Sequence, residues 1–278
     1  MSVLPTILSP ADRQSLRLAH EHLEYPSFAI RLSNVIGTPI EMGLKLLPRS
    51  WYRNLRHHAE SAMWRALNTA VASLKDKQGK SSDRYYKLVG IAGGAVGGFF
   101  GGPALLLELP FTTSVMLRAI ADIARDEGED LDEIETRMAC LEVFALGGHS
   151  RDDDAADTGY YGLRMALEAP IAGASRYIAQ NGLTPHRTGA PMLVDAIVAV
   201  SRRFGVTLSE KAAAEVIPVI GAVGGAYVNS LFIQHFQDMA RSHFTVRRLE
   251  RQYGPRLIRA EYAKFSPPSS PRLVFAPA

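Results

Sequence analysis

Apolar residues recur at helical spacing along most of the chain, and few stretches alternate apolar and polar residues as strands do. An amphipathic helical pattern covers residues 51–75, and Ile134, Met138, Leu141 and Ala145 follow the same period further on. No hairpin dipeptide of the Asn-Gly type separates alternating runs. The pattern therefore predicts an all-α fold, built as a single multi-helix domain.

Capping patterns predict where several helices begin. Residues 9–12 (SPAD) combine an N-cap serine, a proline at the first helical position and an acid at the third. Residues 38–41 (TPIE) repeat this arrangement, and residues 207–210 (TLSE) form a further capping box. We expect a helix start at each of these three places.

Proline and glycine predict further boundaries. Pro110 is expected to open a helix that ends near Gly128, because proline is tolerated in the first turn of a helix. A helix that starts at Asp130 is expected to stop at Gly147 and Gly148, which suit a C-terminal cap.

The stretch GIAGGAVGGFFGGP, residues 90–103, repeats a pair of glycines every four residues. It lies within residues 88–107, which carry no charge, and a second charge-free run covers residues 216–237. A helical glycine costs roughly 0.8–1 kcal/mol relative to alanine, so close contact with another backbone or with lipid must offset that cost. The glycines that we expect to pack against a helix or a membrane are Gly93, Gly94, Gly97, Gly98, Gly101, Gly102, Gly221, Gly224 and Gly225.

Nucleotide binding does not explain the glycine stretch, because neither the P-loop lysine nor the spacing of the dinucleotide fingerprint is present. Three interpretations stay open: a buried helix pair, a re-entrant or interfacial segment, and true membrane spans. A break at Pro103 favours the first two, since about 20 residues are needed to span a bilayer.

Charge is spread unevenly along the 278 residues, although the net charge is only +3. Residues 45–87 hold ten Lys and Arg against three acids, and residues 108–157 hold fourteen acids against four Arg. Residues 241–264 return to seven basic residues and two acids. Basic segments outside two charge-free runs fit the positive-inside rule, with both ends of the chain in the cytoplasm.

The remaining composition points to a cytoplasmic protein, peripheral to the inner face of the membrane. The first residues lack a basic stretch followed by a long apolar one, so no signal peptide is expected. The lone Cys140 excludes a disulfide framework and is expected to be buried and inert. A helical domain over residues 1–264 is expected to be followed by a disordered Pro- and Ser-rich tail, residues 265–278.

An acidic motif carries the enzyme hypothesis. Asp153, Asp154 and Asp157 form a DDxxD pattern, and on a helix Asp153 and Asp157 lie one turn apart, where they could bind Mg²⁺. Mg²⁺-dependent chemistry on a phosphorylated or lipid-like substrate is therefore the alternative function. A second acidic motif is absent from the sequence, and Ser150 with Asp153 also forms an ordinary capping box. No cofactor other than this Mg²⁺ is implied.

Other polar residues stand out from apolar surroundings. Glu108 lies in ALLLELP, and Arg118 lies in VMLRAIADIA, where it either pairs with Asp122 or contacts a phosphate or lipid headgroup. The histidines lack metal-binding spacing. Near the C-terminus we expect a basic surface that contacts anionic lipid or forms an ordinary solvated helix face, with no nucleic-acid partner; it comprises Arg247, Arg248 and Arg251.

Three blocks of the sequence resemble the EcsC family of bacterial proteins. They begin GIAGGAVGGFFGGPALLLELP, CLEVFALGGHSRDDDAADTGYYGLR and VIPVIGAVGGAYVNSLFIQHFQ, and together they reach from about residue 88 to 254. Residues 10–80 match more loosely. The resemblance implies a mostly helical protein with a connection to the membrane, and it assigns no catalytic residue. It places in motif blocks Glu108, Thr112, Thr113, Arg118, Asp154, Tyr160, Arg164 and Asn229.

The sequence as a whole predicts an accessory protein, associated with a membrane surface or membrane complex, that binds lipid or a partner. The alternative is the Mg²⁺-dependent enzyme, with Glu108, Arg118 or Arg164 beside the aspartates. None of these patterns determines the oligomeric state of the protein.

Overall fold

The structure is a computed structural model that describes residues 7–24, 28–37, 39–47, 49–73, 102–147, 159–182, 190–216 and 222–265. Every regular element in these residues is an α-helix, which confirms the all-α prediction. The helices are α1 (Pro10–Glu24), α2 (Phe28–Ile36), α3 (Ile40–Leu46), α4 (Arg49–Ser73), α6 (Gly102–Asp126), α7 (Ile134–Leu146), α9 (Tyr160–Asn181), α10 (Pro191–Val216), α11 (Ala222–Tyr253) and α12 (Pro255–Ala263).

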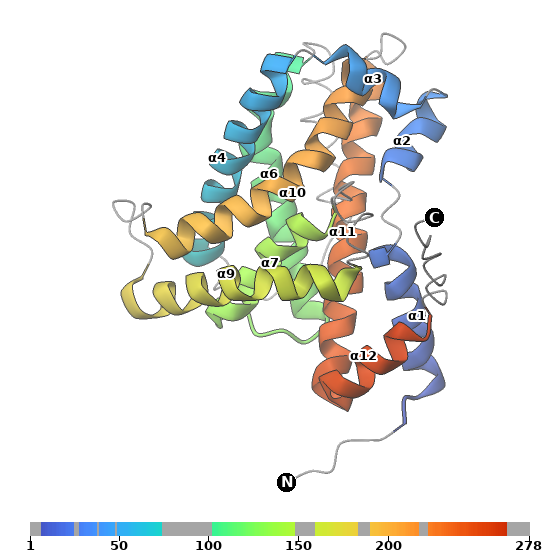
Figure 1. Ribbon diagram of the computed structural model, residues 1–278, viewed down its shortest axis with the longest axis vertical. Helices are drawn as coiled ribbons and strands as arrows, with labels where there is room; N and C mark the ends of the chain where they lie inside the picture. Colours follow the sequence, from blue (N-terminus) through green and yellow to red (C-terminus); the bar gives the residue numbers. More distant parts are fainter. Residues whose placement is uncertain are drawn as a thin grey trace, which may run out of the picture.

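The longest described helix, α11, organises the others (Figure 1). Its 32 residues extend over about 48 Å. Helices α1, α6 and α12 pack along it, while α10 crosses it and also contacts α3, α4 and α9. Helix α7 lies within this arrangement, and eleven of its thirteen residues form an unbroken buried run, Thr136 to Leu146.

An aromatic cluster forms the centre of the core. Phe144 of α7, Phe204 of α10, and Phe232 and Phe236 of α11 are all fully buried. The rings of Phe144 and Phe204 lie 5.1 Å apart between centroids, as do those of Phe232 and Phe236. Edge-on and tilted aromatic contacts at such distances add to the hydrophobic effect of burial. The cluster thus joins α7, α10 and α11.

The predicted helix starts are partly confirmed. The Ser9 side chain accepts a hydrogen bond from the Asp12 backbone at 3.1 Å, so α1 has the expected N-cap. Helix α3 begins at Ile40 as expected, but its first N–H group donates to the Ser33 side chain of α2 at 3.1 Å. Helix α7 ends where predicted, at Gly147.

Three predicted boundaries are wrong. The helix expected to start at Asp130 begins at Ile134. The other two signals lie inside longer helices. Pro110 lies inside α6, which is continuous from Gly102 to Asp126. The capping box at residues 207–210 lies within α10, where Thr207 and Leu208 are buried. In both cases packing of a long apolar face outweighs a local signal that is worth only about 1–3 kcal/mol.

Close backbone contact through glycine occurs at a position outside the predicted set. A Cβ atom added to Gly43 of α3 would lie 2.3 Å from the carbonyl oxygen of Ala213 in α10. Gly147 is similarly crowded, because an added Cβ would lie 2.7 Å from the Phe236 ring. These two glycines allow α3 to approach α10, and the end of α7 to approach α11.

Much of the glycine-rich stretch lies outside the described residues, as do Gly221, the three aspartates of the DDxxD pattern and the C-terminal tail. Gly102 is the first residue of α6, and Gly224 and Gly225 lie in the first turn of α11. Within the described ranges, no helix combines the length and apolar character that a bilayer span requires.

Candidate functional site

A partly buried ion pair joins α9 to α11. The Nη1 group of Arg164 donates to both carboxylate oxygens of Glu250, at 2.9 and 3.0 Å. The Tyr161 hydroxyl also donates to Glu250, at 3.0 Å, and the Arg164 guanidinium lies 5.7 Å from the centre of the Tyr161 ring. Burial and the Glu250 charge raise the pKa of Tyr161, which keeps its hydroxyl protonated as a donor.

The same arginine continues a hydrogen-bonded chain into the interior. Arg164 Nη1 lies 3.3 Å from the Tyr160 hydroxyl, which lies 3.0 Å from His243 Nδ1. Burial lowers the pKa of His243 well below its ordinary value, so the ring is neutral and its Nδ1 accepts from Tyr160. The chain orders Arg164, Tyr160 and His243 into one rigid set of donors and acceptors.

The start of α9 is fixed by a residue from the other end of the sequence. Glu24, the last residue of α1, accepts a hydrogen bond from the Tyr160 backbone N–H at 3.1 Å. An added Cβ at Gly159 would lie 2.4 Å from a Glu24 carboxylate oxygen, so a larger residue there would displace the Glu24 side chain. Carboxylates favour helix N-termini, and this contact sets the position of Tyr160 and Arg164.

The predicted basic surface on α11 is engaged with acids from the segment after α6. Arg247 donates from Nε and Nη2 to the two Glu129 oxygens, at 2.8 and 3.0 Å, and Arg251 also donates to Glu129. Arg248 donates to Glu127 at 2.7 Å. Although burial raises the pKa of Glu129, the two arginines hold it below its ordinary value. These arginines therefore join α11 to the end of α6, and their lipid contact stays a prediction.

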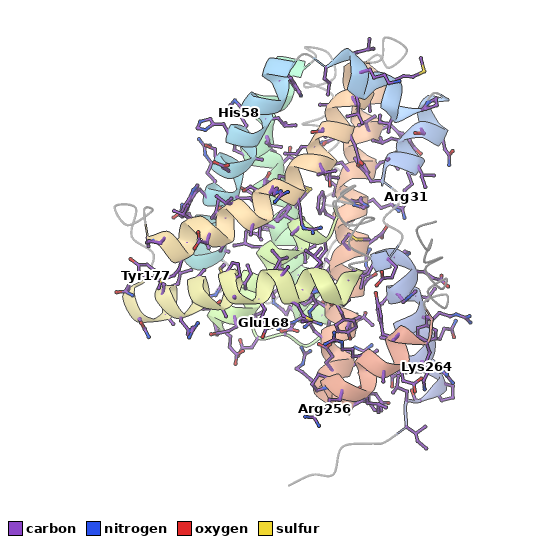
Figure 2. The ribbon with its side chains drawn as sticks, in the orientation of Figure 1. Arg31, His58, Glu168, Tyr177, Arg256 and Lys264 are labelled. Carbon is purple, nitrogen blue, oxygen red and sulfur yellow. The ribbon has the colours of Figure 1, made fainter. Side chains whose placement is uncertain are left out.

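A pocket of about 410 Å³ opens beside the Arg164–Glu250 pair. Helix α7 contributes Glu135 and Glu142, α9 contributes much of one wall, and Arg247 and Glu250 line it from α11. Pro255 and Arg259 of α12 complete it. Figure 2 labels Glu168 on α9, near the α11–α12 corner. We call this cavity the Glu142 pocket.

Glu142 is the most unusual residue of the pocket. Its side chain belongs to the buried run of α7 and is only 8% exposed, yet no described residue donates a hydrogen bond to its carboxyl group. Burial raises its pKa to about 7, against the opposing charges of Arg164 and Arg247. Buried carboxyl groups are normally paired, so this one is a candidate functional group.

Ser175 supplies a second polar group without a partner in this pocket. Its residue is 1% exposed and lines the cavity, but its hydroxyl makes no hydrogen bond within the described structure. A buried hydroxyl that lacks a partner costs about 1–3 kcal/mol. The pocket thus holds both a carboxyl and a hydroxyl whose hydrogen-bonding capacity is unused.

A different kind of surface lies at the opposite end of the molecule. Large apolar side chains are exposed there on α2, α3 and the second turn of α11: Ile30 is 64% exposed, Met42 57%, Leu46 59% and Tyr227 50%. Figure 1 shows α2, α3 and the start of α11 together at the upper end. We call these four residues the α3 surface.

The described parts of both charge-free runs include the first residues of α6 and α11, which lie toward that end. Glu127, just after α6, meets Thr245 and Arg248 of α11, so the C-terminal parts of α6 and α11 lie together. Each helix extends about 35 Å back from that contact, and both begin at the upper end in Figure 1. Gly102 and Ala222, where these helices begin, therefore lie at the same end as the α3 surface.

Comparison with known proteins gives one match. The model of the EcsC protein family matches residues 41–249, which is most of the chain. This chain belongs to the EcsC protein family. No curated protein and no solved structure matches it. The family match confirms the resemblance and also includes α3 and α4, where the sequence blocks were weaker.

The other residues singled out in this EcsC family member are spread over the structure. Arg118 is exposed on α6, and Asp122, one of its two expected partners, accepts a hydrogen bond from Arg125 at 2.9 Å. Cys140 is fully buried, and burial raises its pKa to about 12, as an inert thiol requires. The Glu108 side chain lies outside the described residues, and no group of three potential metal ligands occurs in the described part.

Sequence reasoning identified Arg164 and Tyr160 as targets through the family blocks, and the structure brings them together. It missed Glu142, although an available signal was a lone acid in the apolar run MACLEVFAL. It also missed Ser175 and Gly43, for which no sequence signal existed, because their surroundings are formed by distant helices.

Proposed function

We propose that this EcsC family protein is an accessory protein that binds the membrane surface peripherally, with the α3 surface in contact with lipid. The observation that carries the proposal is the set of exposed apolar side chains on α2, α3 and α11. Exposed apolar groups gathered at one end of a molecule are typical of an interaction surface.

Charge and position favour lipid as the partner. Lys45 is exposed on α3 between Met42 and Leu46, and it opens the segment with ten basic residues against three acids. Interfacial helices combine apolar side chains with Lys and Arg, because the cationic groups meet anionic headgroups. The charge-free runs at residues 88–107 and 216–237 reach the same end, and in this proposal their glycines pack together or meet lipid.

The size of the surface implies reversible binding. Each of the four side chains is a little over half exposed, so its transfer to lipid contributes about 1 kcal/mol. A total of about 4 kcal/mol corresponds to a dissociation constant on the order of 1 mM before electrostatic attraction is added. We therefore expect binding that depends on anionic lipid and weakens with salt.

The test is co-sedimentation with vesicles of phosphatidylglycerol and phosphatidylcholine, compared with vesicles of phosphatidylcholine only. The full chain should sediment with the anionic vesicles at low salt. Leu46→Gln combined with Met42→Gln should remove most of this binding. Leu18→Gln is the matched control, because Leu18 is also an exposed helical leucine but lies on α1, away from the α3 surface.

Two results would contradict the proposal. One is a protein that stays in the supernatant with anionic vesicles at low salt. The other is equal loss of binding in the Leu18 control, which would show a non-specific effect. Co-purification with membrane proteins in the absence of any vesicle binding would instead identify the α3 surface as a protein interface.

A further inference from the structure

We propose that the Glu142 pocket binds a small primary amine with an apolar body, whose ammonium group is held by the Glu142 carboxylate and the Ser175 hydroxyl. The pocket and the α3 surface share no residue. The amine site therefore goes beyond the proposed membrane function, and each proposal can fail without the other.

The unused hydrogen-bonding groups of the pocket match an ammonium group. An ionised carboxylate only accepts hydrogen bonds, a hydroxyl can accept as well, and an ammonium group supplies three donors. The Ser175 hydroxyl has no described partner. The Glu142 carboxyl interacts with the charges of Arg164 and Arg247, without a hydrogen bond from either of them. Charge-assisted hydrogen bonds of this kind are the strong ones, so they can offset the cost of keeping both groups buried.

The charges around the pocket favour a cation over an anion. Arg164 is paired with Glu250, and Arg247 with Glu129. Three further carboxyl groups line the pocket without a described ion-pair partner: Glu135, Glu142 and Glu168. The remaining lining arginine is Arg259. With these three acids against one arginine, the pocket favours a positively charged occupant over a negative one.

The wall formed by Tyr161 already accommodates positive charge. The Arg259 guanidinium lies 5.4 Å from the centre of the Tyr161 ring, and that of Arg164 lies 5.7 Å from it. An aromatic ring stabilises a cation above its face, most strongly where water is excluded. The ring is already engaged by these two guanidinium groups, so the attraction for an incoming ammonium group comes from the Glu142 carboxylate.

The size and apolar lining limit the body of the ligand. Ala139, Met165, Ile171, Ala172 and Pro255 supply apolar surface around the polar groups. A volume of about 410 Å³ is near the lower end of the usual range of roughly 300–1,000 Å³ for ligand pockets. This combination suits an alkyl or aryl amine of modest length, whereas a lipid with two acyl chains exceeds the space.

Amine binding is expected to release a proton. In the empty pocket the pKa of Glu142 is about 7, because burial outweighs the charges of Arg164 and Arg247, with Glu250 and Glu168 adding to the rise. A bound cation favours the carboxylate and lowers this pKa. The association constant should therefore increase about tenfold from pH 6 to pH 8, since an alkylamine, like lysine, stays charged throughout this range.

Few other groups near the pocket change charge in that range. Burial holds the pKa of His243 well below its ordinary value, so this ring stays neutral. Burial also raises the pKa of Tyr160 and of Tyr161, so both hydroxyls stay protonated. The arginines of α9, α11 and α12 stay charged, which leaves Glu142 as the group that couples protons to binding.

The experiment is calorimetric titration of the full chain with hexylamine, in two buffers of different ionisation enthalpy, from pH 6 to pH 8. Hexanol, hexanoate and hexyltrimethylammonium present the same chain with a neutral, an anionic and a non-donating head. Hexylamine should bind most tightly, with proton release at pH 6. The unsubstituted protein can be used for this whole series, so the result does not depend on the folding of a variant.

Substitutions locate the site. Glu142→Gln should weaken hexylamine binding about tenfold or more at pH 8 and remove its pH dependence, because the glutamine amide cannot ionise. Ser175→Ala should weaken binding severalfold and keep the pH dependence. Glu21→Gln on α1, an exposed acid that does not line the pocket, is the matched control and should bind like the unsubstituted protein.

Three results would overturn the proposal. Tighter binding of hexanoate with proton uptake would assign the pocket to an anion held by Arg164, Arg247 and Arg259. Equal binding of hexanol and hexylamine would leave only apolar burial. Hexylamine binding that is unchanged by Glu142→Gln would place the amine elsewhere on the protein.

Discussion

The two ends of this EcsC family protein handle polar and apolar groups in opposite ways. At the α3 surface, apolar side chains face outwards, and α3 contacts α10 through the backbone at Gly43. Around the Glu142 pocket, charged side chains face inwards, and α9 is tied to α11 by the Arg164–Glu250 pair. Each end violates the usual placement of residues, which identifies it as a candidate interaction site.

The difference indicates whether a substitution at each end should change binding, stability or both. An exposed leucine contributes little to folding, so substitutions on the α3 surface should change binding and leave stability intact. The ion pair and the buried carboxyl group at the pocket contribute to the stability of the fold. Substitutions there should therefore change both binding and stability. The predictions below use this contrast.

The largest effect is expected for Arg164→Met. It leaves Glu250 buried with Tyr161 as its remaining described donor, and it breaks the chain to Tyr160. The free energy of unfolding should fall by about 3 kcal/mol or more, as measured by urea denaturation. Arg17→Met is the control: the Arg17–Glu21 pair on α1 is exposed, so its loss should be barely measurable. Similar losses in both variants would contradict the contrast between the two ends.

Glu142→Gln should increase stability at high pH. The folded-state pKa of about 7 lies above the ordinary value of 4.5, so the neutral carboxyl is favoured by folding, and this contribution is lost as the pH rises through 7. At pH 8 the variant should therefore be more stable than the unsubstituted protein, by about 3 kcal/mol at most. The gain should disappear near pH 4.5. Urea denaturation of both proteins across this range measures the difference, and a gain independent of pH would contradict the assigned pKa.

Gly43→Ala tests the close contact that positions α3. The added Cβ would lie 2.3 Å from a backbone oxygen of Ala213, so one helix must move, and we expect a loss of about 2 kcal/mol. Vesicle binding should weaken as well, because α3 carries Met42 and Leu46. Chemical denaturation and co-sedimentation measure the two effects. Unchanged stability would show that α3 is not held against α10.

The smallest effect is expected for Gly205→Ala in the interior of α10. An added Cβ meets no atom within 4 Å, so the substitution should stabilise the helix by about 0.5–1 kcal/mol. Thermal unfolding should show a small increase in the midpoint, with vesicle binding and hexylamine binding unchanged. A loss of stability here would mean that Gly43→Ala cannot be interpreted through packing only.

The fold class follows from local patterns, which is why it was predictable. The helical period and the Ser9 cap depend on residues within one or two turns, and the structure has both. The boundaries at Pro110 and at residues 207–210 were wrong for the same reason. Each was assigned from a weak local preference, whereas the length of α6 and α10 is determined by burial along their whole faces.

The candidate site depended on contacts that span the chain. Glu24 fixes the start of α9, 136 residues away, and Arg164 meets Glu250 across 86 residues. The charges of Arg247, Arg248 and Arg251 suggested a free basic surface, because sequence shows a charge but not its partner. Their pairing with Glu127 and Glu129 appears only once α6 and α11 lie side by side.

By itself the sequence determined that this protein is helical, that it belongs with the EcsC family and that its charges are segregated. These properties are carried by spacing and composition within short segments. Only the tertiary structure decided that Glu142 is buried in a pocket wall, that Gly43 lies at a helix contact and that Met42 and Leu46 of α3 are exposed. Burial and pairing are properties of distant segments brought together, and the hydrophobic effect that brings them together depends on total buried area rather than on any local motif.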